Sequence, residues 1–315
     1  MSASKVALVT GGASGMGLAA AQTLASKSWI VHILDFNAAA GAAALGILPN
    51  AHFHQVDVTS WASLSKAFAD VFARDGRLDF VFANAGIVER DDFYDTPGEG
   101  EEIAEPNQKT VDVNLKAVIN QSYLALCYFR RSPHKGRDAS LVMTASVGGL
   151  YASQFCPIYA ASKAGVINFM RSIAFPYYHS SGIRVYATCP GTVRTNLLNA
   201  KEWTSFPESY FTPLSTIAST VEMLAEGGEM TDAWGKIVRN GENWGLAVEI
   251  NGDRIYFRDQ MDFCDETMRV VIEATSMENQ AARLEEHKAQ AKQVKLRHDG
   301  LATTGGVANG IMAAT

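Results

Sequence analysis

The sequence predicts an α/β protein with a Rossmann-type, doubly wound parallel sheet. Short apolar runs rich in Val, Ile, Leu and Phe alternate with longer helix-like stretches from residue 5 to about 190, which is the pattern of βαβ units. A glycine-rich turn also joins the first apolar run to the first helical stretch. The 315 residues are 47% hydrophobic and 19% charged, an ordinary globular composition. We therefore expect a single domain over residues 1–262.

The order of the predicted elements follows the alternation of the two patterns. The expected strands are residues 5–10, 29–34, 51–56, 78–82, 140–144 and 183–188. The expected helices between and after them are residues 15–27, 37–45, 60–74, 108–131 and 157–179. One compact doubly wound sheet accounts for all of these elements.

Beyond residue 190 the pattern changes. Residues 194–213 are crowded with aromatic side chains between two proline-marked turns, and we expect them to form a lid over a substrate. A helix is expected at residues 214–226. Residues 247–257 resemble a β-hairpin that turns at residues 251–253.

The last part of the chain is predicted to lie outside the domain. Residues 263–299 are expected to form a helical extension, with the helical pattern ending near residue 293. Residues 300–315 contain Gly, Ala and Thr without periodicity, which predicts a disordered tail. The sequence leaves open whether the extension joins an interface or covers a site in its own subunit, and it leaves the role of the acidic insert at residues 96–102 open as well.

Charge and cysteine content exclude several classes of protein. The net charge is −6 and the isoelectric point is near 5.7, which argues against a nucleic-acid partner because phosphate binding needs clustered Lys and Arg. The four cysteines show no metal-binding spacing, so we expect no metal site and reduced thiols: Cys127, Cys156, Cys189 and Cys264. No signal peptide or membrane-spanning apolar run is recognised, and a soluble, cytoplasmic protein is expected.

The glycine-rich turn predicts a dinucleotide site. Gly11, Gly15 and Gly17 suit a tight turn, close approach of the backbone to a pyrophosphate and close helix–strand packing. Ser14 and Met16 belong to the same predicted cofactor loop. The alternative is a plain βα turn, but such a turn needs only one glycine, so the nucleotide interpretation is favoured.

Asp35 ends the second predicted strand, about twenty residues after the glycine turn. A carboxylate there is placed for the hydroxyls of an adenosine ribose and repels a ribose phosphate. Positions 14 and 36 carry no Arg or Lys that could receive such a phosphate. NAD is therefore the expected cofactor, although Asp35 could instead cap the next helix.

Two further strand ends supply candidate cofactor contacts. Asp57 and Val58 follow the third strand and would suit the adenine edge. Asn84, Ala85 and Gly86 follow the fourth strand and leave room for backbone contact with the cofactor. Either set could equally be turn chemistry.

Tyr159 and Lys163 stand four residues apart in a predicted helix, so the phenol and the ammonium lie on one face. A nearby cation favours the phenolate and lowers a tyrosine pKa from its usual value near ~10. The pair predicts proton transfer to or from an alcohol. By itself the spacing also fits an ordinary amphipathic helix.

In combination these motifs resemble the short-chain dehydrogenase/reductase family over residues 5–196. The motifs that carry the resemblance are Thr10–Gly17 (TGGASGMG), Asn84–Gly86 (NAG), Asn114, Ser146, Tyr159 with Lys163 (YxxxK), and Pro190–Thr195 (PGTVRT). The family implies a catalytic tetrad of Asn114, Ser146, Tyr159 and Lys163. It also implies that Pro190, Gly191 and Thr192 lie beside the nicotinamide, and Val193 and Thr195 are taken as further cofactor contacts.

The resemblance assigns each tetrad member a role. Tyr159 would carry the hydroxyl proton, and Ser146 would hold the same oxygen. Lys163 would lower the tyrosine pKa and bind the nicotinamide ribose, while Asn114 would anchor a water leading to solvent. The alternatives are a turn-forming Ser146, a helix kink at Asn114 and a solvated Lys163. An Asn among apolar neighbours is costly unless its amide is satisfied, which favours a role in the site.

Residues 244–257 resemble the corresponding part of NAD-dependent hydroxyprostaglandin dehydrogenases and insect-type alcohol dehydrogenases, which implies a secondary alcohol as substrate. The predicted pocket is aromatic and apolar, although such side chains are as often core residues: Val147, Tyr151, Phe155, Trp203, Phe206, Tyr210 and Phe211. They predict a bulky alcohol or ketone, such as a lipid-like or polyketide-like secondary metabolite.

The leading hypothesis is an NAD(H)-dependent oxidoreductase of a hydrophobic secondary alcohol and its ketone. The alternatives are an NADP(H)-dependent ketone reductase of biosynthesis and a non-catalytic NAD-binding scaffold or sensor. The family also implies a homodimer or homotetramer built on the helices at residues 108–131 and 157–178, which are apolar on more than one side.

Overall fold

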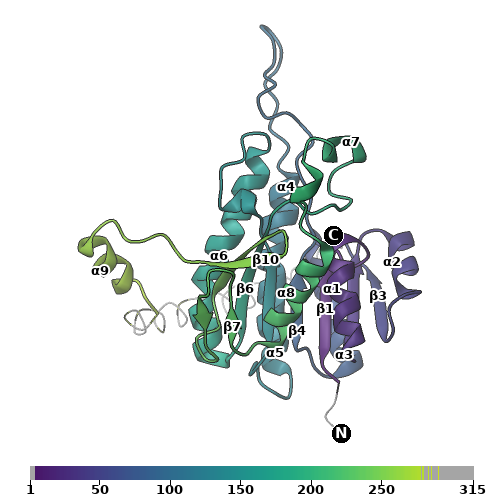
Figure 1. Cartoon of the computed structure of the whole chain (residues 1–315), viewed down its shortest axis with the longest axis vertical. Coiled ribbons are helices and arrows are strands. Elements are labelled where there is room, and N and C mark those ends of the chain that lie inside the picture. The colour runs from purple at the N-terminus through teal and green to yellow at the C-terminus, as the bar shows by residue number, and fades with distance from the viewer. Residues whose placement is uncertain (1–3, 278, 280–282, 284, 286–289, 291–315) are drawn as a thin grey trace, which may run out of the picture. The chain divides into compact units, whose positions relative to one another are not determined.

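The computed structural model of the protein describes residues 4–277, 279, 283, 285 and 290. The chain forms two compact units, Met1–Asp259 and Gln260–Thr315. The first unit holds both sheets and helices α1 to α8, and the described helix of the second unit is α9 (Glu266–Ala274) (Figure 1).

The first unit is built on an eight-stranded sheet with the order β10-β9-β6-β5-β4-β1-β2-β3. Its strands are β1 (Val6–Thr10), β2 (Ile30–Asp35), β3 (Ala51–Gln55), β4 (Phe80–Ala83), β5 (Ser140–Thr144), β6 (Arg184–Pro190), β9 (Leu246–Asn251) and β10 (Arg254–Arg258). All neighbours pair in parallel except β9 and β10. The predicted doubly wound parallel sheet is confirmed, and the predicted hairpin forms its antiparallel edge.

The central strands are buried on both faces. β1, β4, β5 and β6 are buried along their whole length, as expected for near-continuous apolar runs in a parallel sheet covered by helices. Helices α1 and α8 pack together on one face of the sheet. Their side chains belong to the same apolar cluster as side chains of the strands on that face. Helices α3, α5 and α6 contribute to a second cluster on the other face.

The helices follow the predicted order. Those of the first unit are α1 (Gly15–Ser26), α2 (Ala38–Leu45), α3 (Trp61–Asp75), α4 (Lys109–Val111), α5 (Ala117–Arg131), α6 (Pro157–Ser181), α7 (Ala200–Trp203) and α8 (Leu214–Glu226). The segment at residues 194–213 contains α7 and the 3-10 turn η3 (Glu208–Tyr210). We call this segment the lid.

Two features differ from the sequence prediction. The single helix expected at residues 108–131 is divided, because the π-helical turn η1 (Asp112–Lys116) separates α4 from α5. A two-stranded sheet of β7 (Met230–Thr231) and β8 (Ile237–Val238) was not predicted.

In the predicted extension, α9 covers Glu266–Ala274, and residues 283, 285 and 290 are also helical. Most of the remaining extension and the predicted tail at residues 300–315 lie outside the described residues. Among the residues that the structure does describe, no helix is both long and apolar enough to cross a membrane.

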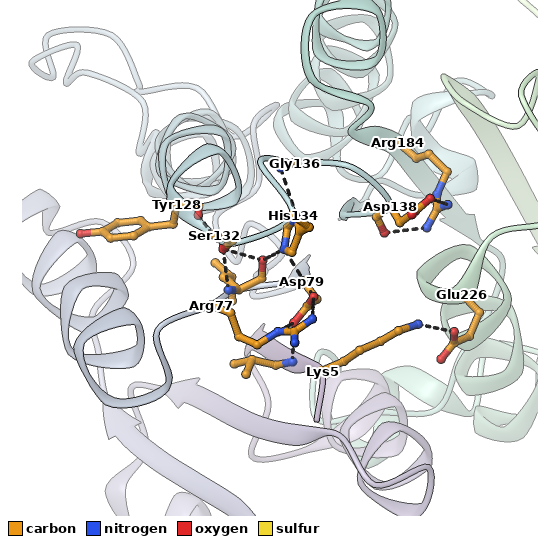
Figure 2. A network of polar contacts seen from close by, with 12 residues as sticks. Lys5, Arg77, Asp79, Tyr128, Ser132, His134, Gly136, Asp138, Arg184 and Glu226 are labelled. Carbon is orange, nitrogen blue, oxygen red and sulfur yellow. Dashed lines mark hydrogen bonds and ion pairs between the residues drawn. The ribbon is translucent and has the colours of Figure 1, made fainter. Parts of the chain in front are cut away.

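A polar network joins the amino ends of the parallel strands (Figure 2). The carboxylate of Asp79, just before β4, accepts the backbone N–H of Val6 at 2.8 Å and pairs with the guanidinium of Arg77 at 2.6 Å. Ser132 accepts the N–H of Leu78 at 2.9 Å. These contacts fasten the starts of β1 and β4 and the end of α5 to one another, at the end of the sheet opposite the carboxyl ends of the strands.

Candidate active site

Two adjoining cavities open where the parallel strands end, the usual place for ligands in such sheets. The larger has a volume of about 680 Å³ and extends from the glycine turn and Asp35 to Lys163. The smaller, of about 340 Å³, lies between the segment after β5 and the lid. Tyr159 and Thr144 line both cavities, and so does Met16. The phenol therefore stands at the junction of the two.

The glycine turn has the geometry of a phosphate-binding loop. Gly11 and Gly15 have φ of +63° and +52°, values that side chains disfavour. A Cβ on Gly17 would lie 2.2 Å from the carbonyl oxygen of Gly11. Gly11, Ser14, Gly15 and Met16 line the larger cavity, whereas Gly17 packs the helix against the turn. Backbone N–H groups at the start of α1 thus border an open space, which fits a phosphate.

Asp35 lies at the end of β2 and lines the same cavity. One carboxylate oxygen accepts the N–H of Ala13 at 3.1 Å, and the other accepts the N–H of Asn37 at 3.0 Å. The cap of α2 is Asn37, whose side chain accepts the N–H of Ala40. Asp35 is therefore not the cap of α2, which was the alternative role that the sequence allowed.

The other predicted strand ends also line the larger cavity: Asp57, Val58, Asn84, Ala85 and Gly86. Asp57 accepts hydrogen bonds from the N–H and hydroxyl of Thr59, which lower the pKa of its carboxyl. Asn84 donates to the carbonyl of Thr10 at 3.1 Å and accepts from the hydroxyl of Thr144 at 3.2 Å. Its amide thus ties β1, β4 and β5 together behind the cavity wall.

Ser146, Tyr159 and Lys163 come together at the junction. Tyr159 and Lys163 project from α6, and Ser146 follows β5 by two residues. The ammonium of Lys163 donates to the carbonyl of Thr144 at 2.6 Å and lies 5.6 Å from the centre of the Tyr159 ring. The hydroxyl of Ser146 accepts the N–H of Gly148 at 3.1 Å.

Burial governs the titration of the pair. It lowers the pKa of Lys163 to about 8. It raises the pKa of Tyr159 above its ordinary value, and a hydrogen bond with Ser146 opposes this only in part. A tyrosine pKa lowered by Lys163 was expected, but in this structure desolvation outweighs the cation, whose nitrogen is turned to the Thr144 carbonyl.

Asn114 lies in the π-helical turn η1 and is fully buried. Its side-chain oxygen accepts the N–H of Ile87 at 2.9 Å, and its nitrogen donates to the carbonyl of Ile87 at 2.8 Å and to Ser162 at 3.2 Å. The amide is satisfied, as a site role requires. Its protein partners hold the loop after β4, and its role in anchoring a water stays a prediction.

The structure brings together only part of the predicted substrate pocket. Val147, Tyr151, Trp203 and Phe206 line the smaller cavity, with Pro190, Gly191, Thr192 and Val193 beside them, and Thr195 lines both cavities.

The other three predicted aromatics lie outside both cavities. Phe155 is 96% exposed and Tyr210 is 69% exposed. Phe211 packs on Trp203 and under the guanidinium of Arg194. Aromatic density along the chain does not show whether a side chain lines a cavity. A pocket predicted from that density therefore contains these three residues as well.

Several cavity residues were missed by sequence reasoning. Glu89, Arg90 and Lys109 bring charge to the larger cavity, and Phe36 follows Asp35 in its wall. Glu89 and Arg90 come three and four residues after Gly86, so their proximity to that motif was the one available signal.

A glycine-cradled cavity that meets a partly buried Tyr and a buried Lys defines the class of dinucleotide-dependent oxidoreductases. Comparison with known proteins agrees: a family model described as short chain dehydrogenase matches residues 5–204. The chain belongs to the short-chain dehydrogenase family, and it is an oxidoreductase of that family.

Individual relatives extend the match. The chain is 48% identical to short-chain dehydrogenase/reductase prx7 of Penicillium rubens over 276 residues, which cover 84% of this chain and 98% of that protein. It is 34% identical to human 15-hydroxyprostaglandin dehydrogenase [NAD(+)] over 63% of this chain and 71% of that protein. Among solved structures, a 3-ketoacyl-(acyl-carrier-protein) reductase from Brucella melitensis, complexed with NADH, shares the fold with a TM-score of 0.64 at 24% identity, covering 79% of this chain and 98% of that one.

Proposed function

We propose that the protein is an NAD(H)-dependent oxidoreductase that interconverts a bulky hydrophobic secondary alcohol and its ketone. The observation that carries the proposal is the position of Tyr159 at the junction of the two cavities, beside Ser146 and Lys163. A cofactor in the larger cavity and a substrate in the smaller one would meet at this phenol.

The larger cavity fits a nicotinamide dinucleotide. The glycine turn would receive the pyrophosphate, and Asp35 would receive the hydroxyls of the adenosine ribose. Lys163 lines the same cavity beside the ring of Tyr159, where the nicotinamide ribose would be held, and the side chain of Thr195 lies next to Gly15 of the glycine turn. When bound, the cofactor supplies the hydride acceptor or donor.

The residues of this chain would carry out the proton transfer. Tyr159 would give its phenolic proton to the carbonyl oxygen during ketone reduction and take the hydroxyl proton during alcohol oxidation. Ser146, hydrogen-bonded to Tyr159, would hold the same oxygen. The ammonium of Lys163, in a fully buried position, would stabilise the phenolate when it forms.

Three observations support NAD over NADP. The carboxylate of Asp35 borders the larger cavity, and positions 14 and 36 are Ser and Phe, so neither supplies a cation for a ribose phosphate. The human relative named for prostaglandin oxidation is also named for NAD. Tighter binding of NADPH than NADH, with Asp35→Ala changing little, would favour the biosynthetic NADP(H) reductase instead.

The smaller cavity supports a hydrophobic substrate. Val147, Trp203 and Phe206 present apolar walls to it, and a volume of about 340 Å³ accommodates the reacting part of a substrate considerably larger than a short alcohol. A lipid-like or polyketide-like secondary metabolite fits this description.

The test is NADH absorbance at 340 nm with a panel of hydrophobic and short-chain secondary alcohols and ketones. Wild type is expected to prefer the bulky substrates with NAD(H), and Tyr159→Phe is expected to lose at least ~100-fold in kcat. Tyr94→Phe, at an exposed tyrosine that precedes the acidic insert, is the matched control. Equal rates for Tyr159→Phe and wild type would refute the role of Tyr159, and binding of NADH without turnover of any substrate would favour a scaffold or sensor.

A further inference from the structure

The amino end of α6 lacks a cap of its own. Helix starts leave backbone N–H groups without intrahelical partners. The residue before α6, Cys156, makes no side-chain capping bond, and the helix opens with Pro157. Tyr159 is the third residue of this first turn, so its own N–H is one of the groups that need an acceptor.

Glu89 supplies that acceptor from the loop after β4. One oxygen of its carboxylate accepts the N–H of Ile158 at 2.9 Å, and the other accepts the N–H of Tyr159. Pro157 has no N–H, and the N–H of Ala160 already bonds to the carbonyl of Cys156. In the first turn, the N–H groups of Ile158 and Tyr159 are therefore bonded by the carboxylate of Glu89.

The support for Glu89 itself comes from the tetrad. Asn114 binds both backbone groups of Ile87, two residues before Glu89. Glu89 then binds the backbone of Tyr159. The loop after β4 is therefore bonded to η1 at Ile87 and to Tyr159 at Glu89, and the two bonded residues are two positions apart in the chain.

We propose that Glu89 is a positioning residue that fixes Tyr159 for proton transfer, an inference that rests on the proposed function of Tyr159. Two oxygens on two adjacent N–H groups define the direction of the first helical turn, and a negative charge is favourable at a helix amino end. Near-attack geometry is sensitive to small displacements, so loosening this turn lowers the rate of chemistry more than it lowers the affinity for the cofactor.

The competing reading is an ordinary helix cap that contributes stability alone. Ser60 offers the matched control, because its side chain caps α3 by accepting the N–H of Ser63 at 3.3 Å, and α3 carries no residue of the tetrad. Glu102→Gln controls for loss of one negative charge, since Glu102 lies in the exposed insert.

The experiment compares full-length Glu89→Gln and Glu89→Ala with wild type, Ser60→Ala and Glu102→Gln. In Glu89→Ala we expect kcat to fall by ~10- to 100-fold while the Kd for NADH, measured by its fluorescence, changes by less than about twofold. Glu89→Gln, which keeps one acceptor for two N–H groups, should show an intermediate loss. Both controls should keep wild-type kcat, and kcat within about twofold of wild type in both Glu89 variants would overturn the proposal.

Hydrogen exchange separates this inference from the proposed function. The N–H groups of Ile158 and Tyr159 should exchange faster in Glu89→Ala, and in Glu89→Gln if the alanine variant does not fold, but not in Ser60→Ala. Unchanged exchange would overturn the contact itself. A wild-type protein without turnover would instead overturn the proposed function and the catalytic consequence, while faster exchange in the variant would still support Glu89 as the anchor of this turn.

Discussion

Lys163 is buried and Tyr159 is partly buried, and desolvation acts on their pKa values in opposite directions. Desolvation disfavours the charged form of each group, so it raises the pKa of the phenol and lowers the pKa of the ammonium to about 8. Near neutral pH the phenol therefore keeps its proton in this structure, while Lys163 is mostly charged. This state suits the acid that ketone reduction needs.

The protonation state of Tyr159 predicts opposite pH dependence for the two directions. Oxidation of an alcohol needs the phenolate, so its kcat should rise with pH through the neutral and alkaline range. Reduction of the ketone needs the protonated phenol, so its kcat should stay level through the neutral range and fall only as the pH approaches the raised pKa of Tyr159. Steady-state profiles in both directions from pH 6 to 10 test this, and a reduction rate that rises with pH would contradict it.

Replacing Lys163 is expected to raise the free energy of unfolding and to lower kcat. A lysine pKa lowered from 10.5 to about 8 corresponds to roughly 3 kcal/mol against the buried charge at neutral pH. Lys163→Met keeps the volume and removes the charge, at the loss of a hydrogen bond to Thr144 worth about 1–2 kcal/mol. The variant should unfold in urea with a free energy about 1 kcal/mol above wild type at pH 7, with greatly reduced kcat.

The pH dependence of this effect has a defined sign. The folded pKa lies below the unfolded value, so the penalty in wild type is fully present below pH 8 and disappears as the pH rises towards 10.5. The advantage of Lys163→Met should therefore shrink at pH 9.5. Lys66→Met, on an exposed face of α3, is the control and should stay within ~0.5 kcal/mol of wild type. Lower stability of Lys163→Met than wild type at pH 7 would refute the argument.

At the scale of elements, the loop after β4 contacts both α6 and the lid. Next to Glu89, the guanidinium of Arg90 bonds to both oxygens of Glu202 at 2.6 and 2.9 Å and to the carbonyl of Leu197 at 2.7 Å. Glu202 also closes the capping box of α7 with Asn199. Arg90 thus ties the short lid helix to the rim of the larger cavity.

Breaking this tie should affect substrate binding more than stability. Both side chains are well exposed, so the ion pair is screened by solvent and contributes little to the free energy of unfolding. Arg90→Gln and Glu202→Gln should each raise the substrate KM several-fold, because a loosened lid encloses the substrate less well. Steady-state kinetics and the rate of proteolytic cleavage within residues 198–210 measure the effect.

The charge-swapped pair provides the decisive comparison. Arg90→Glu combined with Glu202→Arg should recover part of the lost KM, since the attraction is restored with reversed sign. The control is Glu208→Gln, which breaks the ion pair between Glu208 and Arg194. Both residues of this pair lie within the lid. If Glu208→Gln raised KM as much as Arg90→Gln, the tie between loop and lid would not be the cause.

The elements also show what the sequence could and could not predict. β5 and α8 lie at the predicted residues, because short buried runs and a regular amphipathic period mark them clearly. The π-turn at η1 was missed, since one extra residue in a helical turn leaves the apolar period almost unchanged. Glu89 was missed because its partners stand about seventy residues away, and the roles of the predicted tetrad stay predictions.

At the scale of the whole first unit, the candidate active site and the polar network lie at opposite ends of the strands. The cavities open at the carboxyl ends of the parallel strands, where loops can vary. The network of Figure 2 lies at their amino ends, where Asp79 binds Val6 and Arg77 and the ring of His134 bonds to the carbonyl of Leu78 at 3.0 Å. Substitutions at the two ends should therefore have separable consequences.

Asp79 provides the test of that separation. Asp79→Ala removes a mostly buried carboxylate that pairs with Arg77 and accepts the N–H of Val6, and we expect it to lower the free energy of unfolding by about 2–4 kcal/mol. Asp70→Ala breaks an exposed pair with Lys66 and should cost less than ~0.5 kcal/mol.

Because the whole length of the strands stands between Asp79 and the cavities, kcat per folded molecule should match wild type at a temperature where Asp79→Ala is folded. Urea unfolding and initial rates on the same preparations give both quantities. A fall in kcat that accompanies the loss of stability would show that the amino ends of the strands also position the site, and the two ends of the sheet would then act as one unit.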